Sequence, residues 1–310
     1  MKILITGATG FFGQEIALRL SEEGCDVIKT SRSPYPDTDL KYLDITLPDR
    51  CRKLFAENKD IDTVVHCAAI AHKKQGDLTE EYYRRVNADG VLNVLESAVA
   101  FSAKRFVFIS SVAVYGEFDL PVPVTEEHPA MPLGPYATAK KKAEEYCLDR
   151  QGQIDIYILR MATMYSKEWV FNIRKRVAPP VAGSFCYLLF EPGERRYSLC
   201  SRRNGTEAVK RIIEGNLSPG IYNVADNYLY CQEDILKAVR RVDGKRPTLT
   251  VPEAVLRAGL AAVKLISSPT LYEAIYGQYW KFCRPNIFST DKLLAAGFNS
   301  GSDLLAMAGG

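Results

Sequence analysis

The sequence predicts an α/β protein with a doubly wound parallel sheet and a smaller C-terminal lobe. In the first 160 residues, short runs rich in apolar and β-branched residues alternate with longer segments of helical periodicity. Most of these runs are almost continuously apolar, which is typical of strands buried on both faces. A group of glycines also follows the first run and opens the first helical segment. Strands that alternate with helices imply right-handed crossovers and a parallel sheet.

The individual elements follow from their patterns in chain order. In the third helical segment, apolar residues recur three and four apart and form one stripe. Expected strands are Lys2–Thr6, Asp26–Ser31, Thr63–Ala69, Arg105–Ser111 and Asp155–Arg160, and expected helices are residues 12–23, 48–58, 80–102 and 136–151.

The regular alternation fades after Arg160. Proline and glycine interrupt residues 166–203 and 246–310, which indicates a loop-rich lobe. Between them, a helix near 204–215 and a strand near Ile221–Val224 are expected to return to the sheet. The predicted organisation is therefore a nucleotide-binding domain of residues 1–165 joined by residues 204–245, and a substrate-binding lobe of residues 166–203 and 246–310. A small-molecule cleft is expected between the two.

Composition and charge exclude several classes of partner. The 40 basic and 37 acidic residues leave a formal charge of +3, which is too mild for a nucleic-acid surface. Eight cysteines stand singly, as expected of reduced thiols, and the chain opens on an apolar run rather than on a signal-peptide pattern. We therefore expect a cytoplasmic protein with a small-molecule partner and no integral membrane segment. Residues 253–266 form the most lipophilic helical segment; a packed helix is favoured over one lying on a membrane surface.

The glycine group predicts a dinucleotide site of the Rossmann type. Gly7, Gly10 and Gly13 stand in TGATGFFG, directly after a strand and at the start of a helix that also contains Phe11 and Phe12. Glycine allows the tight turn and the close approach of a pyrophosphate, and the helix N-terminus supplies free N–H donors.

The end of the second strand bears on the choice of cofactor. An acidic residue there would accept hydrogen bonds from the ribose 2′-hydroxyl of NAD, but this strand ends in Ser31 followed by Arg32. A guanidinium favours a 2′-phosphate, so NADP(H) is preferred and NAD(H) remains possible. A solvent-facing arginine is the alternative. Asp44 and Ile45 are placed to meet the adenine, although Asp44 fits a simple turn equally well.

Four motifs in order carry a resemblance to a known family. TGATGFFG, HCAA (66–69), SSVAVYG (110–116) and PYATAK (135–140) resemble those of the extended short-chain dehydrogenase/reductase family, in its nucleotide-sugar epimerase/dehydratase branch. The resemblance runs from residue 1 to about 165 and continues weakly to the end. It implies an enzyme that uses NAD(P), with Ala68 and Ala69 beside the cofactor.

The chemistry of hydride transfer explains the residue types in these motifs. A proton must move to or from the sugar oxygen, yet a free tyrosine has a pKa of ~10. Lys140 lies one helical turn after Tyr136 and supplies positive charge, and Ser111 at a strand end offers a hydrogen bond to the reacting oxygen. The resemblance implies that Tyr136 is the acid/base, Lys140 its tuner and ribose ligand, and Ser111 the orienting group.

Other positions are weaker candidates. Asn87 resembles the family asparagine that holds a relay water, or is an ordinary helix residue, and Ser110 is a less favoured serine. His66, Cys67 and His72 form a His/Cys group, but adjacent strand residues point to opposite faces, so no metal is expected. A Ser-His-Asp hydrolase is disfavoured because the sequence has no G-x-S-x-G elbow.

The residues after Ser111 bear on the reaction. Related 4,6-dehydratases carry an acidic pair there, whereas this chain has Val112 and Ala113. Ketone reduction or epimerisation at C4 of a nucleotide sugar remains, and Arg32 modestly favours the reductase. A reductase of steroid- or flavonoid-like alcohols and a non-catalytic cofactor sensor are the alternatives.

The substrate lobe is less clearly specified. The resemblance makes Arg195 or Arg196 the diphosphate ligand, with Asn172 and Arg284 as weaker candidates and surface charge as the alternative. The chain departs from the family pattern at Met161 and at Arg202-Arg203-Asn204, where proline and an acidic pair are common. By analogy, the helices at 80–102 and 136–151 predict a homodimer.

Overall fold

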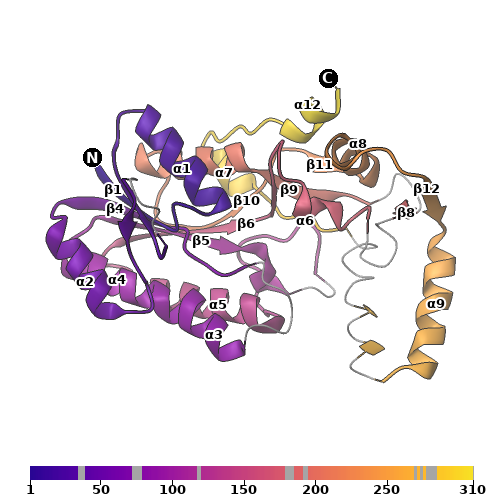
Figure 1. Ribbon diagram of the computed structural model, residues 1–310, viewed down its shortest axis with the longest axis horizontal. Coiled ribbons are helices and arrows are strands. Elements are labelled where there is room, and N and C mark those ends of the chain that lie inside the picture. The colour runs from indigo at the N-terminus through magenta and orange to yellow at the C-terminus, as the bar shows by residue number, and fades with distance from the viewer. Residues whose placement is uncertain are drawn as a thin grey trace.

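A seven-stranded parallel sheet crosses the larger part of the molecule, with helices on both faces (Figure 1). The computed structural model describes residues 1–33, 39–71, 79–116, 120–178, 185–190, 195–268, 271–272, 275–276 and 285–309. The strand order is β10-β6-β5-β4-β1-β2-β3. The first strands are added on one side of β1 and the later ones on its other side, as in a doubly wound sheet. The strands are β1 (Lys2–Thr6), β2 (Asp26–Ser31), β3 (Lys41–Tyr42), β4 (Ile61–His66), β5 (Arg105–Ser111), β6 (Asp155–Met161) and β10 (Gly220–Val224).

The α/β prediction is confirmed, and several strands have the predicted bounds. β1, β2 and β5 coincide with the predictions, while β4 ends at His66 rather than at residue 69. The chain leaves the sheet there, since Gly7 and Ala68 approach closely where the glycine turn begins. β10 pairs with β6 in parallel, so this part of the chain does return to the large sheet.

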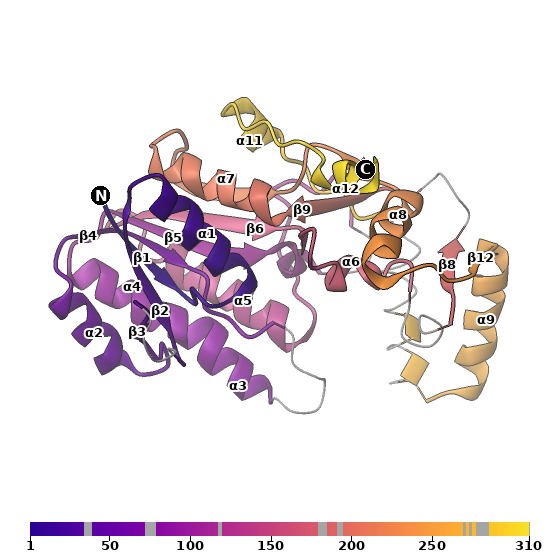
Figure 2. The ribbon, with the colours of Figure 1, turned by 45° about the horizontal axis from the view of Figure 1, so that its top comes forward.

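Helices cover the two faces of the sheet in two groups (Figure 2). α1 and α7 contact each other on one face, while α4 contacts both α2 and α5 on the other. Of the apolar stripe expected in the third helical segment, Val91, Leu95 and Ala98 are fully inaccessible, while Leu92 and Val99 are half-buried. These helices are α1 (Phe11–Glu22), α2 (Pro48–Glu57), α4 (Gly90–Ala100), α5 (Gly134–Leu148) and α7 (Arg202–Ile213).

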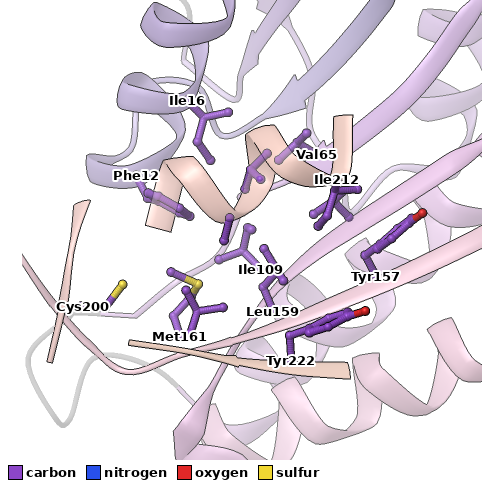
Figure 3. Close-up of a cluster of buried hydrophobic side chains, with 14 of the residues drawn as sticks. Phe12, Ile16, Val65, Ile109, Tyr157, Leu159, Met161, Cys200, Ile212 and Tyr222 are labelled. Atoms are coloured by element: carbon purple, nitrogen blue, oxygen red, sulfur yellow. The ribbon is translucent and has the colours of Figure 1, made fainter. Parts of the chain in front are cut away.

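The core beneath α1 and α7 fixes the position of the glycine turn. Phe12 and Ile16 of α1 and Ile212 of α7 point onto Ile109 and Leu159 of the sheet (Figure 3). Burying each such side chain contributes roughly 1.5–3 kcal/mol. Because Phe12 is in this cluster, the start of α1 is held against the ends of β5 and β6.

The helix predicted at 80–102 is three pieces rather than one. α3 (Glu80–Arg84), capped by the Thr79 side chain, leads into a π-helical turn, η1 (Arg85–Asp89), and then into α4. π-Helical turns often mark functional positions. This one contains Asn87, whose amide group bonds to the backbone of Ile70.

The smaller lobe has a core of its own. Buried tyrosines gather there, and Asp226 accepts hydrogen bonds from Tyr165 (2.6 Å) and Tyr230 (2.7 Å). The lobe contains β7 (Thr163–Tyr165), β8 (Tyr187–Phe190), β9 (Tyr197–Ser201), β11 (Leu229–Tyr230), β12 (Thr248–Val251), α6 (Phe171–Arg174), α8 (Gln232–Asp243), α9 (Glu253–Ile266) and α12 (Asp303–Gly309), while α11 (Asp291–Ala295) contacts β10.

The lobe departs from the predicted organisation at α8. Residues 204–245 were expected with the large sheet, but α8 packs against α6, α12 and β8. Ile235 and Val239 supply apolar contacts that bury α8 in the lobe core. The remaining domain boundaries stay a prediction. Among the described residues, no helix is long and apolar enough to cross a membrane.

Gly13→Ala should lower both stability and dinucleotide binding. A Cβ at Gly13 would lie 2.4 Å from the Gly7 carbonyl oxygen and 3.2 Å from Ala8 Cα, both of which are backbone atoms. We expect a loss of about 1–3 kcal/mol in the free energy of unfolding, measured by urea denaturation. Gly259→Ala is the control, because its Cβ enters open space within a helix and should stabilise by up to about 1 kcal/mol. Equal stability of the two variants would contradict the close approach.

Candidate active site

The glycine turn is built for close approach between two backbone segments. Gly7 has φ +68°, and a Cβ there would lie 2.7 Å from Ala68 Cα. The Gly10 N–H donates to the Gly7 carbonyl oxygen (2.9 Å), which closes the turn just before α1 begins at Phe11. The N-terminal N–H groups of α1 are thereby presented at the end of the sheet, where a phosphate group is stabilised.

A cavity of about 1010 Å³ opens beside this turn. Its walls come from the glycine turn, the carboxyl ends of β4, β5 and β6, the start of α5 and the smaller lobe. The predicted residues on its wall are Gly10, Phe11, Phe12, Gly13, Ala69, Ser111, Tyr136, Lys140 and Asn172, and the less favoured Ser110 is also on it.

Tyr136 and Ser111 meet in the wall of the cavity. Tyr136 lies in the first turn of α5, Ser111 is the last residue of β5, and both line the cavity. Burial raises the pKa of Tyr136 to about 12, and the neighbouring Ser111 hydroxyl opposes that rise. Ser111 Oγ also accepts from the Ala113 N–H (3.2 Å) at the start of η2 (Val112–Tyr115), which fixes its position.

Lys140 is a buried cation one turn along α5. Its Nζ donates to the Ile109 carbonyl oxygen (2.7 Å) and lies 4.6 Å from the centre of the Phe108 ring. Burial lowers the pKa of Lys140 to about 8, and the nearby Glu144 carboxylate opposes that shift in part. The helical spacing expected from the sequence therefore does bring Lys140 and Tyr136 to the same cavity.

Ser110 has a different environment from Ser111. Its Oγ donates to Glu144 Oε1 (2.6 Å), and Glu144 forms an ion pair with Arg160 (2.7 Å) beneath the cavity. Both charged side chains are at least 95% buried. Because Ser110 is engaged in this network, its neighbour Ser111 is the serine available to a ligand.

The comparison with known families rests on most of the chain. The sequence model of the NAD dependent epimerase/dehydratase family matches residues 3–225. The chain belongs to this family. Curated relatives include UDP-arabinose 4-epimerase 1 of Arabidopsis thaliana, 32% identical over 176 residues, and UDP-glucose 4-epimerase of Vibrio cholerae, 30% identical over 169 residues.

These similarities cover only part of each curated relative. The matched segments are 51% and 53% of this chain, and the chain spans 41% and 52% of the length of those two proteins. Solved structures cover it more fully. A short-chain dehydrogenase/reductase superfamily protein from Agrobacterium tumefaciens with bound NAD aligns over 99% of this chain and 95% of its own, with TM-score 0.77 and 18% identity.

A second solved structure agrees with the first. The Thermus thermophilus UDP-glucose 4-epimerase complex with NAD aligns over 97% of this chain and 94% of its own, with TM-score 0.70 and 21% identity. At these identities the likeness concerns the fold, which is that of extended short-chain dehydrogenases/reductases.

In this epimerase/dehydratase family member, the residues expected around the adenosine are mainly held by their neighbours. Ser31 Oγ lies 3.1 Å from Thr9 Oγ1, and Arg32 Nη1 donates to the Tyr82 hydroxyl (3.1 Å) while the side chain stays exposed. Asp44 Oδ1 accepts from Thr46, as the turn interpretation expected. Ile45 is buried and approaches Gly90. Ser31 borders the glycine turn through Thr9, and none of these four residues lines the cavity.

Asn87 lies away from the cavity. Its Nδ2 donates to the Ile70 carbonyl oxygen and its Oδ1 accepts from the Ile70 N–H, both at 2.8 Å. The side chain therefore holds the segment after β4 in place. The structure gives it this anchoring contact, and the relay-water role expected from the resemblance stays a prediction.

The predicted substrate ligands separate into different environments. Asn172 lines the cavity, but Arg195 does not. The Arg195 guanidinium is buried, donates to the Phe190 carbonyl oxygen and pairs with Glu253 (3.0 Å). Arg195 therefore joins the end of β8 to the start of α9. Arg196 is half-buried beside β9 and also lies off the cavity wall. Arg284 lies outside the described residues.

Lys175, Arg176 and Trp169 are among the wall residues that the sequence did not predict. Arg176 and Lys175 line the cavity next to Asn172, and Arg176 Nη2 donates to Thr163 Oγ1 (3.1 Å). Trp169 packs on Phe11 with ring centres 4.3 Å apart, which joins the lobe to the glycine turn. The basic run after Asn172 was the available signal, although nothing in the sequence places a short helix against the cavity.

The His/Cys group is divided as the strand geometry predicted. His66 is fully buried near the Phe106 and Phe108 rings, and burial lowers its pKa to about 3, whereas Cys67 lines the cavity. His72 lies outside the described residues. Across the part of the chain that the structure describes, no three His, Cys, Asp or Glu residues form a metal-binding group.

The buried charge of Lys140 should appear in the pH dependence of stability. Its folded-state pKa is depressed, so the cost of burying the charge is full below pH 8 and is relieved between pH 8 and about 10.5. Lys140→Met should therefore be stabilised relative to the wild type at pH 7.5, by an amount on the order of 3 kcal/mol that shrinks as pH rises. Urea denaturation at pH 7.5, 8.5 and 9.5 measures this difference.

Lys142→Met is the control for that experiment. Lys142 is exposed on the same helix, and Glu145 raises rather than lowers its pKa. The stability difference of this variant should not shrink between pH 7.5 and 9.5. If the stability difference between Lys140→Met and the wild type did not change with pH, burial of the Lys140 charge would not cost the folded protein stability.

Proposed function

We propose that the chain catalyses epimerisation at C4 of a nucleotide sugar with a nicotinamide dinucleotide as its cofactor. The observation that carries this proposal is the placement of Tyr136, Ser111 and Lys140 on one cavity with the glycine turn. The curated relatives named 4-epimerases support it. The turn fits the cofactor because it closes just before α1 and places the start of that helix, with its free N–H groups, on the cavity wall, where a pyrophosphate is stabilised.

The residues of the wall divide the proton chemistry between them. Tyr136 accepts the proton from the C4 hydroxyl as the C4 hydride leaves, and returns it when hydride comes back on the other face of the sugar. The bound cofactor supplies the hydride acceptor and, when oxidised, a positive charge. Ser111 hydrogen-bonds the reacting oxygen and orients it toward Tyr136.

The positive charge of Lys140 counteracts the raised pKa of Tyr136. A phenol whose pKa is raised to about 12 by burial is a poor base at neutral pH. A cation at Lys140 stabilises the phenolate, and each pKa unit corresponds to about 1.4 kcal/mol. A phenolate at Tyr136 also gives the buried Lys140 charge a partner of opposite sign. The raised pKa of Tyr136 and the lowered pKa of Lys140 therefore offset each other when Tyr136 is deprotonated.

The charge of the cavity matches a diphosphate. Lys140, Lys175 and Arg176 line it, and none of the described lining residues is acidic. Arg176 and Lys175 lie on the lobe side, so we assign the substrate diphosphate to them together with Asn172. Val112 and Ala113 line the wall where a dehydratase would need an acid and a base, which disfavours loss of water from the sugar.

The reaction is tested by incubating the protein with UDP-arabinose or UDP-glucose and following both C4 epimers by chromatography. An epimerase equilibrates them without added NADPH. The ketoreductase, favoured modestly from Arg32, would instead consume NADPH with a 4-keto nucleotide sugar. If the protein bound NAD but showed neither epimerase nor ketoreductase activity, two interpretations would remain: a reductase of steroid- or flavonoid-like alcohols, or a non-catalytic cofactor sensor.

Arg32 should decide how well the site accepts NADP(H). Its guanidinium is exposed just after β2 and donates to the neutral hydroxyl of Tyr82 (3.1 Å). We expect Arg32→Ala to weaken NADP(H) binding about tenfold and to change NAD(H) binding less than about twofold, by calorimetry. Arg50→Ala is the control, because Arg50 is also an exposed arginine but lies over the Tyr42 ring. Equal weakening of both cofactors would remove Arg32 from the cofactor site.

The assembly is a separate proposal by family analogy. α4 and α5 contact each other on one face of the sheet, and α5 carries Tyr136 and Lys140. A homodimer through these helices would brace the catalytic helix. Light scattering at micromolar concentration tests it, and a monomer mass would refute it.

A further inference from the structure

Helix α9 packs on the lobe by one side only. Leu256 and Leu260 contact a small cluster around Phe190 and Leu188, and no residue of α9 is fully buried. The helix stands at the far edge of the molecule from β1, beyond β8 and β12 (Figure 1). Its other side is therefore open.

The open side of α9 carries only apolar residues. At about 100° per residue, eight positions fall within one arc of about 160°. Val255 is 59% exposed and Leu265 and Ile266 are each 86% exposed, while a Cβ on Gly259 would meet nothing within 4 Å. The eight exposed residues, which we call the outer face, are Ala254, Val255, Ala258, Gly259, Ala261, Ala262, Leu265 and Ile266.

Positive charge is concentrated in the same part of the chain. Residues 237–268 hold seven Lys or Arg and two Asp or Glu, whereas the whole chain has a net charge of only +3. The two acidic residues are already paired, Asp243 with Arg174 (2.7 Å) and Glu253 with Arg257 (2.6 Å). Lys237 and Lys245 are exposed. The lobe therefore offers an apolar helix face within a basic region.

The size of the outer face argues against a second copy as its occupant. A 14-residue helix is about 21 Å long, so one side covers roughly 200–300 Å², well short of the ~800 Å² that each partner buries in a stable dimer. A bilayer surface has no such requirement, since an amphipathic helix inserts its apolar side shallowly and basic residues add attraction to anionic lipid.

We propose that the outer face of α9 docks this protein on the surface of an anionic lipid bilayer. Leu265, Ile266 and Val255 enter the boundary between headgroups and acyl chains, and the exposed lysines of 237–268 (Lys237, Lys245 and Lys264) face the headgroups. The helix lies in the plane of the surface and does not cross it.

The test is sedimentation of the full chain with vesicles of phosphatidylcholine and phosphatidylglycerol (70:30), compared with phosphatidylcholine alone. We expect binding to the mixed vesicles, released by 0.5 M salt because the charges are screened. Leu265→Glu/Ile266→Glu should lower the partition coefficient at least about tenfold. Lys237→Glu/Lys245→Glu should weaken binding to the mixed vesicles and leave binding to the neutral ones unchanged.

Leu18→Glu is the matched control, because Leu18 is a 54% exposed apolar residue on α1 and should not contribute. Thermal melts establish that the variants are folded. Three results would overturn the proposal. The first is no vesicle binding by the wild type, and the second is an equal loss of vesicle binding with Leu18→Glu and with Leu265→Glu/Ile266→Glu. The third is a wild-type dimer that Leu265→Glu/Ile266→Glu converts to a monomer. The last would assign the outer face to a second copy.

Discussion

Tyr136→Phe should lower the rate of C4 interconversion by about 10³-fold or more while leaving the fold and dinucleotide binding intact. The substitution removes only the hydroxyl of a residue that lines the cavity together with Ser111. A positioned general acid/base contributes typically ~10²–10⁴-fold, and here one group serves both halves of the reaction. Turnover of UDP-sugars by chromatography and cofactor binding by calorimetry measure the two effects separately.

Tyr146→Phe is the matched control for this prediction. Tyr146 lies on the same helix but contacts Lys142 on the surface, away from the cavity lining. Its rate should stay within about twofold of the wild type, as expected of a surface change. If Tyr136→Phe turned over at the wild-type rate, Tyr136 would be only a helix residue and the proposed chemistry would be wrong.

Glu144→Ala should destabilise the protein by about 3–5 kcal/mol. Glu144 is buried in α5, pairs with Arg160 (2.7 Å) and accepts from Ser110 (2.6 Å), so its removal leaves a buried guanidinium without its carboxylate. The Arg160 side chain also lies over the Tyr115 ring, where water has little access. Urea denaturation gives the free energy of unfolding.

Glu145→Ala separates this effect from a general loss of helix charge. Glu145 is the next residue of α5, but it is exposed and pairs with Lys141 and Lys142 at the surface. Such exposed pairs contribute about 0–1 kcal/mol each, so the expected loss is small. A similar loss in both variants would mean that the network beneath the cavity adds nothing to stability.

The sequence predicted most of the large sheet and the centre of the site. The bounds of β1, β2 and β5 follow from apolar runs that end at glycine or serine, and the glycine spacing follows from a turn that admits no Cβ. Tyr136 and Lys140 were found because PYATAK resembles a family motif, and their spacing of four places both on the same side of a helix. Local rules decide these features, so local patterns reveal them.

Contacts between segments far apart in the sequence could not be predicted from local patterns. Arg195 matches a family position, yet it pairs with Glu253, which is 58 residues away, and lies off the cavity. Asn87 interrupts an apparently continuous helix because its amide bonds to Ile70. Arg176 reaches the cavity because α6 packs against β7.

The order of residues thus determined the parallel sheet, the glycine turn and the placement of Tyr136 and Lys140 on one side of a helix, since each depends on the pattern within a short stretch. The tertiary structure decided which serine is free, which arginines face the cavity and which side of α9 is left open. These depend on long-range packing and on buried charges that must find partners, here Glu144 with Arg160 and Arg195 with Glu253.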